Sequence, residues 1–211
     1  MHLIRTVIAT FVCLLCSTFP TFAQDTFPTT EAFLKATLKE VDRLSAEAKG
    51  DLNGDGTEDW VGVIHSQRVD EAPTYQLFVL LRAADGLNRI AVKTQPAEIP
   101  GMGCCWMEDL NIRRGSIYVQ NNAKDVSTME AATHQFKLHR GDWRLVGVRV
   151  FLTDHTPEAP MTIDTDINVL TGVVIEKTQK ADNKPTSRRR QKKFPASFLK
   201  DFDFSNGFGT Q

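Results

Sequence analysis

The sequence is poor in cysteine, with four among 211 residues. Two of them, Cys13 and Cys16, lie in the N-terminal segment, whereas Cys104 and Cys105 are adjacent to each other. Neighbouring cysteines can close only a small strained ring, so a disulfide that staples a long loop is excluded for this pair. Two free thiols, a vicinal disulfide, and a metal or intermolecular role stay open. We therefore expect a domain held together by its hydrophobic core.

The sequence also lacks an excess of charge, with 25 Lys and Arg against 26 Asp and Glu. Such a balance gives no general attraction to nucleic acid or to a membrane surface. Beyond the N-terminal segment, no apolar run reaches the length of a membrane span. The motifs GxSxG and HExxH are absent too, as is a phosphate-binding Gly-rich loop, so the corresponding enzyme classes have no local signature here.

The N-terminal segment has the organisation of a secretory signal peptide. Arg5 is followed by a mostly apolar stretch from Val7 to Leu15, and small residues precede a possible cut after Ala23. Removal of residues 1–23 leaves 188 residues, enough for one domain with a substantial core. A buried N-terminal helix and a lipoprotein lipidated at Cys16 are the alternatives, and a Leu before that Cys disfavours the second. We expect a periplasmic or secreted protein.

Hydrophobic periodicity predicts one helix followed by strands. Apolar residues recur at helical spacing near residues 30–47, directly after a helix-start signal. The segments DWVGVIHS (59–66) and TYQLFVLLR (74–82) are apolar on both faces and rich in β-branched and aromatic residues, which is typical of strands covered on both sides. A third strand is expected from Leu87 onward.

Three later stretches carry the signature of β-hairpins. Each places apolar runs on both sides of a turn that contains glycine, and glycine supplies the positive backbone angle of a tight reversal. The turns are Arg114-Gly115, Arg140-Gly141-Asp142 and Leu170-Thr171-Gly172. In the second hairpin we expect Phe136 and Leu138 to face Trp143 and Leu145. The predicted fold class is α+β, mostly antiparallel β: a meander of about eight strands, as a curled sheet or partial barrel, with one N-terminal helix.

The expected organisation has three parts: a signal peptide (1–23), a single β-rich domain (24–179), and a C-terminal segment (180–211). The last part begins as an exposed basic arm, in which Arg188 to Lys193 read RRRQKK. In an exported protein such a run is a solvated tail or is weakly attracted to anionic polymers of the envelope. The apolar piece at 194–204 is expected to dock its phenylalanines on the core.

The segment GDLNGDGTEDW, from Gly50 to Trp60, concentrates acidic residues in one tight turn. Oxygen-bearing side chains stand at positions 1, 3, 5 and 9 of the pattern, and Gly56 permits a sharp bend; these side chains belong to Asp51, Asn53, Asp55 and Asp59. Calcium prefers six to eight oxygen ligands, and the carbonyl of Thr57 can add another. Carboxylates that repel one another in an empty turn would then become ligands. An Asx-rich turn without a metal is the alternative.

This pattern resembles the EF-hand loop and, more closely, the calcium loops of FG-GAP (VCBS-type) repeats. An EF-hand has Glu at position 12, where this chain has Gly62, and continues into a helix. Here the loop has Asp59 at position 9 and leads into a predicted strand. The resemblance implies Asp51, Asn53, Asp55 and Asp59 as side-chain ligands of calcium. We expect a structural calcium ion at a helix-to-strand corner; magnesium fits less well because it demands a stricter octahedron.

A wider resemblance covers roughly residues 48–179 and includes GDWRLVG and DINVLTGVVIEK. These stretches are similar to a group of small secreted or periplasmic bacterial proteins of uncharacterised function. The segment GMGCCWMED (101–109) departs from the Gly-Asp-Pro-aromatic run expected there. The resemblance implies compartment and fold class, and it implies no activity. Because the acidic loop occurs once, a β-propeller is not expected.

The remaining candidates are weaker. No two histidines have the spacing of metal ligands, and alternation puts His134 on the face of Phe136 and Leu138, as for a core histidine. The segment GMGCCWMED (101–109) is either an adaptable apolar binding surface or a loop over the end of the sheet. Cys104 or Cys105 is a conceivable nucleophile, although no activating base lies nearby in the sequence.

The function expected from these observations is that of an exported, calcium-stabilised, non-enzymatic binding protein of the bacterial envelope. Its partner is an unknown envelope protein or polymer, with no nucleic acid and no transmembrane segment. One alternative is a hydrolase that uses carboxylates or Cys105 in a cleft near residues 101–109. Another is a periplasmic immunity or inhibitor protein against a toxin, an antibiotic or a wall-degrading enzyme.

Overall fold

The computed structural model describes residues 25–69, 71–98, 105–124, 126–156, 160–181 and 183–203, with the backbone alone at 98 and 105–108. The predicted signal peptide and Cys104 lie outside these residues. The elements, in chain order, are β1 (Thr26–Phe27), α1 (Thr30–Thr37), β2 (Asp42–Gly50), β3 (Asp59–Ser66), β4 (Thr74–Arg82), β5 (Asn88–Lys93), β6 (Ala97–Glu98), β7 (Cys105–Arg113), β8 (Ser116–Lys124), β9 (Thr128–His139), β10 (Asp142–Asp154), β11 (Met161–Asn168), β12 (Val173–Lys180), β13 (Thr186–Gln191) and the 3₁₀ turn η1 (Leu199–Asp201).

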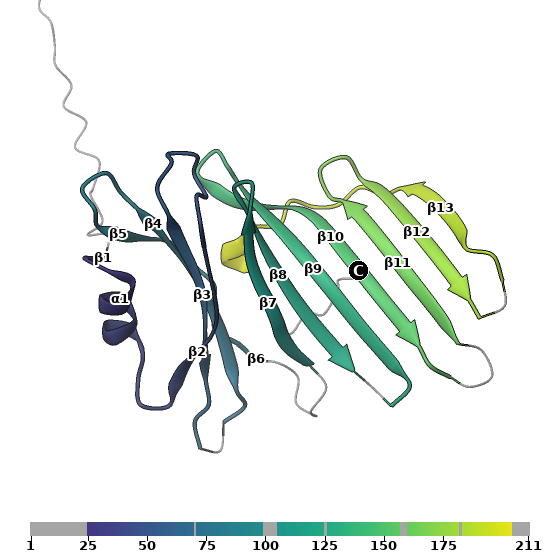
Figure 1. Cartoon of the computed structure of the whole chain (residues 1–211), viewed down its shortest axis with the longest axis horizontal. Helices are drawn as coiled ribbons and strands as arrows, with labels where there is room; N and C mark the ends of the chain where they lie inside the picture. Colours follow the sequence, from purple (N-terminus) through teal and green to yellow (C-terminus); the bar gives the residue numbers. More distant parts are fainter. Residues whose placement is uncertain are drawn as a thin grey trace, which may run out of the picture.

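The strands form two antiparallel sheets (Figure 1). The first sheet has the order β1-β5-β4-β3-β2, and β6 also pairs with β4. The second sheet is a seven-stranded meander from β7 to β13. Strand β2 lies beside β7, while β11, β12 and β13 extend away from the first sheet. The predicted fold class, α+β with mostly antiparallel strands, is therefore confirmed. The strands form two sheets, whereas the sequence suggested one curled sheet or partial barrel.

Strand β3 is covered on both faces, as its apolar sequence predicts. On one face Trp60 and Ile64 pack with Phe33 of α1 in a cluster completed by Phe78 and Leu80. On the other face Val61 and Val63 join the core between the two sheets. The second sheet supplies that core with Leu110, Ile117, Val119, Phe136 and Trp143. The first sheet is thus the middle layer between a helix and a second sheet.

The predicted helix at 30–47 was too long. Helix α1 is N-capped by the Thr29 hydroxyl, which accepts the N–H of Ala32 at 3.1 Å, and it ends at Thr37 because Leu38 is extended. Residues from Asp42 onward form β2, in which half-buried and exposed side chains alternate strictly. The apolar residues at 38, 41 and 44 fit a helical period, but the alternation from Leu44 to Ala48 has the period of a strand. The strand is formed and not the helix because residues 42–50 pair with β3.

The three predicted hairpins are confirmed. Arg114 and Gly115 have φ of 52° and 67°, and Arg140 and Gly141 have φ of 53° and 87°, so both two-residue turns use left-handed backbone at both positions. In the second hairpin Trp143 pairs with Leu138. The expected tight reversal at Gly172 also has a positive φ.

Residues 186–203, in the predicted C-terminal segment, are part of the fold. The segment expected to be an exposed arm instead forms β13, the edge strand of the second sheet, with Arg188, Arg189 and Arg190 exposed. An edge strand rich in Arg and Lys resists pairing with other chains. Further on, Leu199 is buried in the core between the sheets, and the ring of Phe202 packs edge-on against that of Phe136. In the described residues, no helix combines the length and apolar character needed to cross a bilayer.

Candidate functional site

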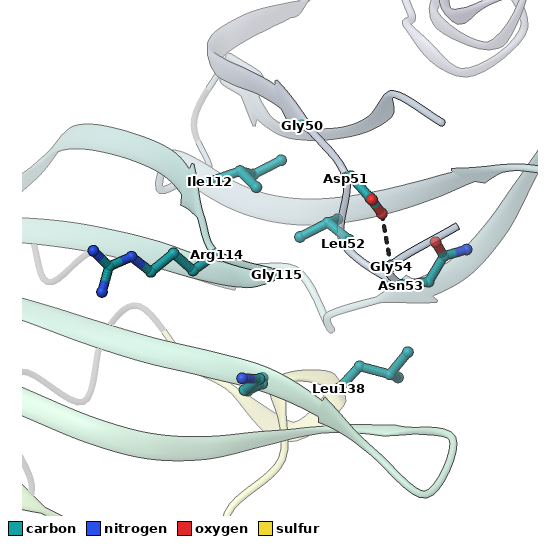
Figure 2. A pocket seen from close by; sticks show the side chains of 10 residues that line it. Gly50, Asp51, Leu52, Asn53, Gly54, Ile112, Arg114, Gly115 and Leu138 are labelled. Carbon is teal, nitrogen blue, oxygen red and sulfur yellow. Dashed lines mark hydrogen bonds between the residues drawn. The ribbon is translucent and has the colours of Figure 1, made fainter. Parts of the chain in front are cut away.

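The acidic turn, residues 51–58, joins β2 to β3, so it connects two strands and not a helix and a strand as the sequence suggested. Leu52 anchors it, because this side chain is only 3% exposed and belongs to the core between the sheets. The β7–β8 hairpin packs against the turn: a Cβ built on Gly115 would lie 3.5 Å from the Leu52 carbonyl oxygen. The turn therefore lies directly against the β7–β8 hairpin of the second sheet, as Figure 2 shows.

Two glycines give the turn its shape. Gly54 and Gly56 have φ of 81° and 79°, a backbone conformation that other residues adopt at a cost. A Cβ at either position would meet no described atom within 4 Å, so backbone conformation and not space requires glycine there.

The exposed side chains of the turn bind its own backbone. Asp51 accepts the N–H groups of Gly54 and Gly56 at 2.7 and 2.9 Å, one on each carboxylate oxygen. Asp55 accepts the N–H of Thr57 at 2.7 Å and the side-chain amide of Asn53 at 2.9 Å. The Asn53 oxygen in turn accepts the N–H of Asp55 at 3.0 Å. These are Asx-type hydrogen bonds, and they define the turn without a ligand.

Asp59 has a different environment, since it is 1% exposed. One of its oxygens accepts the backbone N–H of Leu52 at 2.8 Å, and the other accepts that of Arg82 on β4 at 2.9 Å. Burial raises the pKa of this carboxyl above its ordinary value. The two hydrogen bonds act against that shift, whereas the negative charges of Asp55 and Asp51 add to it. Asp59 thus joins the turn to β4, and its pKa depends on the charges of Asp55 and Asp51.

The donor set has the chemistry that calcium prefers, because every candidate side chain offers oxygen. Each of the side-chain oxygens accepts a hydrogen bond, and each keeps a second lone pair. Within the described parts of the chain, however, no group of three or more His, Cys, Asp or Glu side chains gathers closely enough to hold a metal ion. Asp51, Asn53 and Asp55 share one turn and Asp59 lies buried beneath it, so an ion would require the exposed side chains to rearrange.

An open depression of about 620 Å³ lies between the acidic turn and the second sheet. Residues 50–54 form one side of it, and the other side consists of Ile112, Arg114, Gly115, Lys137 and Leu138. Figure 2 shows the Arg114 side chain directed away from the turn. The depression therefore gives solvent access to the acidic turn without placing this guanidinium opposite the carboxylates.

The other candidates from the sequence have different outcomes. Residues 101–104, including Cys104, lie outside the described residues, and so does the side chain of Cys105. His134 is a core histidine, as predicted: it is 7% exposed, and its ring packs edge-on against that of Phe202. Burial lowers the pKa of His134 to about 4, and a hydrogen bond with the backbone of Val119 opposes the shift. This histidine belongs to the packing of the core.

The sequence reasoning missed a polar recess on the outer face of the second sheet. It is lined by residues of five adjacent strands, β7 to β11, which alternate along β7, β8 and β9. The signal was present in the sequence as the polar half of each alternating strand, for example Asp109, Asn111 and Arg113, which alternate with Leu110 and Ile112. Such positions are ordinarily solvated, so only the assembled sheet shows that they share one hollow.

The chain matches no known protein family, no curated protein and no solved structure.

Proposed function

We propose that the chain is an exported, non-enzymatic binding protein of the bacterial envelope whose acidic turn is stabilised by calcium. The observation that carries the calcium part is Asp59. Burial is the main cause of the raised pKa of this carboxylate, and the negative charges of Asp55 and Asp51 add to the shift. A dication in the turn would offset this repulsion and favour the ionised form of Asp59.

The spacing of the oxygen donors supports the same proposal. The turn leads directly into β3, in the manner of the FG-GAP-type loop that the pattern resembles. The side chains that would hold the ion are Asp51, Asn53, Asp55 and Asp59, together with the carbonyl of Thr57. Because extracytoplasmic calcium reaches millimolar levels, even a weak site of this kind would be filled after export.

The ion would have a structural role in this proposal. The turn lies against the β7–β8 hairpin and contributes Leu52 to the core between the sheets. An ion that orders the turn would therefore also stabilise the position of the first sheet against the second. Such a role suits a protein that presents a rigid surface for binding.

The test is thermal unfolding in calcium, in magnesium and in chelator, combined with calorimetric titration of calcium. We expect calcium to raise the melting temperature more than magnesium does, and Asp55→Ala to abolish the calcium effect. Asp85→Ala is the matched control, because Asp85 also accepts a backbone N–H in a tight turn, from Leu87 at 3.0 Å. It should melt lower than the unaltered protein but keep the calcium shift. Equal melting curves with and without calcium would refute the calcium part of the proposal.

A further inference from the structure

The outer face of the second sheet carries two parallel rows of polar side chains. The strand registers align Asn111, Tyr118, Gln135 and Gly147 in one row. They align Asp109, Gln120, Thr133, Arg149 and Asp166 in the next row. The opposite face of β7, β8, β9 and the start of β10 belongs to the core between the sheets. The rows run across the strands and therefore lie on a rigid support, covering roughly 19 Å at an inter-strand spacing of about 4.8 Å.

A hollow of about 320 Å³ is built into these rows. The register of β10 shifts between Leu145 and Gly147, and such a bulge bends a strand and redirects its side chains. Gly147 lines the hollow and has no side chain to fill it. A Cβ at this position would lie 3.2 Å from the side-chain oxygen of Gln135, closer than ordinary contact. The recess thus depends on glycine at this position.

The chemistry of the lining is polar and balanced in charge. The recess is lined by two acidic residues, Asp109 and Asp166, and by two basic residues, Arg113 and Arg149. Asp164, just outside the recess, binds the Arg149 guanidinium at 2.9 and 3.0 Å, which offsets its charge and fixes its orientation. A polyanion requires a net positive surface, so this balance disfavours an anionic polymer as the occupant. A peptide added as a further strand would bind at a sheet edge and not on this face.

The central groups of the recess suit a ligand rich in hydroxyl groups. Gln120, Thr133 and Gln135 are half-buried and offer amide and hydroxyl donors and acceptors. The Gln135 amide is positioned by a hydrogen bond of 3.2 Å to the Ser116 hydroxyl. The half-buried ring of Tyr118 lies in the same recess and provides an apolar surface with a polar tip.

From these observations we propose that the outer face of β7 to β11 binds a neutral glycan chain lying across the strands. Amide, hydroxyl, carboxylate and guanidinium groups would bind its hydroxyls, and the Tyr118 ring would pack on the apolar face of a sugar ring. This inference rests on the proposed binding role and names its ligand class, but it does not depend on calcium, because no residue of the acidic turn lines the recess.

The test is calorimetric titration of the protein, purified after expression of the full chain, with cellohexaose, maltohexaose and chitohexaose, and with hexagalacturonate as the anionic comparator. Each titration is run in calcium and in chelator. We expect at least one neutral hexasaccharide to bind under both conditions. Tyr118→Ala should weaken that binding about tenfold, and Thr133→Val, which removes one hydroxyl at nearly constant volume, about threefold.

Phe194→Ala is the matched control, since Phe194 is a half-buried aromatic residue that follows β13, outside strands β7 to β11, and does not line the recess. This variant should bind as the unaltered protein does. The melting temperature of every variant is measured first, and each titration is run well below it, so that a loss of binding does not reflect unfolding. Absence of binding to all three neutral chains, binding of hexagalacturonate alone, or unchanged affinity in Thr133→Val would overturn the inference. None of these results bears on the calcium-dependent melting, so the two proposals fail separately.

Discussion

The carboxylate of Asp59 accepts a hydrogen bond of 2.9 Å from the backbone N–H of Arg82 on the neighbouring strand. The same carboxylate binds Leu52 with its other oxygen, so one buried side chain connects the acidic turn to β4. A carboxylate is suited to this position because both of its oxygens are acceptors and both partners are donors.

Asp59→Asn should therefore destabilise the fold. The amide keeps one acceptor but turns an NH₂ group toward a backbone N–H, which leaves a buried donor without an acceptor. We expect a loss of about 2 kcal/mol in the free energy of unfolding, measured by urea denaturation in chelator so that calcium does not contribute. Asp85→Asn, in an exposed turn, should cost less than about 0.5 kcal/mol. Equal losses in the two variants would show that the buried connection is not important.

His134 predicts a specific sensitivity to acid. In the unfolded chain histidine titrates near its ordinary pKa of about 6.5, whereas burial lowers the pKa of His134 to about 4 in the folded protein. Between these values the unfolded state binds one more proton, so stability is complete above pH 6.5 and is lost as the pH falls toward 4. The expected loss is about 3 kcal/mol.

The measurement is the free energy of unfolding as a function of pH for the unaltered protein and for His134→Leu. The variant should lose less stability between pH 6.5 and 4, by the amount that His134 contributes. His139→Gln, which changes an exposed histidine of the same strand, should keep the steeper dependence. If His134→Leu had the same pH dependence as the unaltered protein, a buried neutral histidine would not be the cause.

Leu199 tests the contribution of the C-terminal segment to the core. This side chain is fully buried between the sheets, so Leu199→Ala should cost about 3 kcal/mol through lost burial and a residual cavity. Leu170, which is 54% exposed in a turn, is the matched control, and Leu170→Ala should cost less than about 0.5 kcal/mol. Chemical denaturation measures both. A small effect at Leu199 would mean that the segment is not docked in solution.

The strands and hairpins were predictable because their signals are local. An apolar run on both faces predicted β3 with its correct bounds, and glycine in tight turns predicted the reversals at Gly115 and Gly141. The end of α1 was not predictable with the same certainty, since the apolar residues near Leu44 fit a helix and a strand equally well. Only the partner strand β3, distant in sequence, distinguishes the two.

The two candidate sites differ in how local their sequence signals are. The acidic turn is a continuous segment, so its donors were visible in the sequence, although its place between two strands was not. The recess draws its lining from five strands, between Asp109 and Asp166. Its polar residues become neighbours only through the strand registers and the bulge beside Gly147. No pattern within a short window contains that information.

The central position of β3 has a consequence for how the chain folds. A fragment ending at Glu98 would contain the whole first sheet and α1, yet it would expose to water the four aliphatic side chains that β3 and β4 bury against the second sheet, namely Val61, Val63, Leu77 and Val79. Neither half can therefore reach its final burial alone, and we expect the two sheets to form and melt together in one cooperative transition.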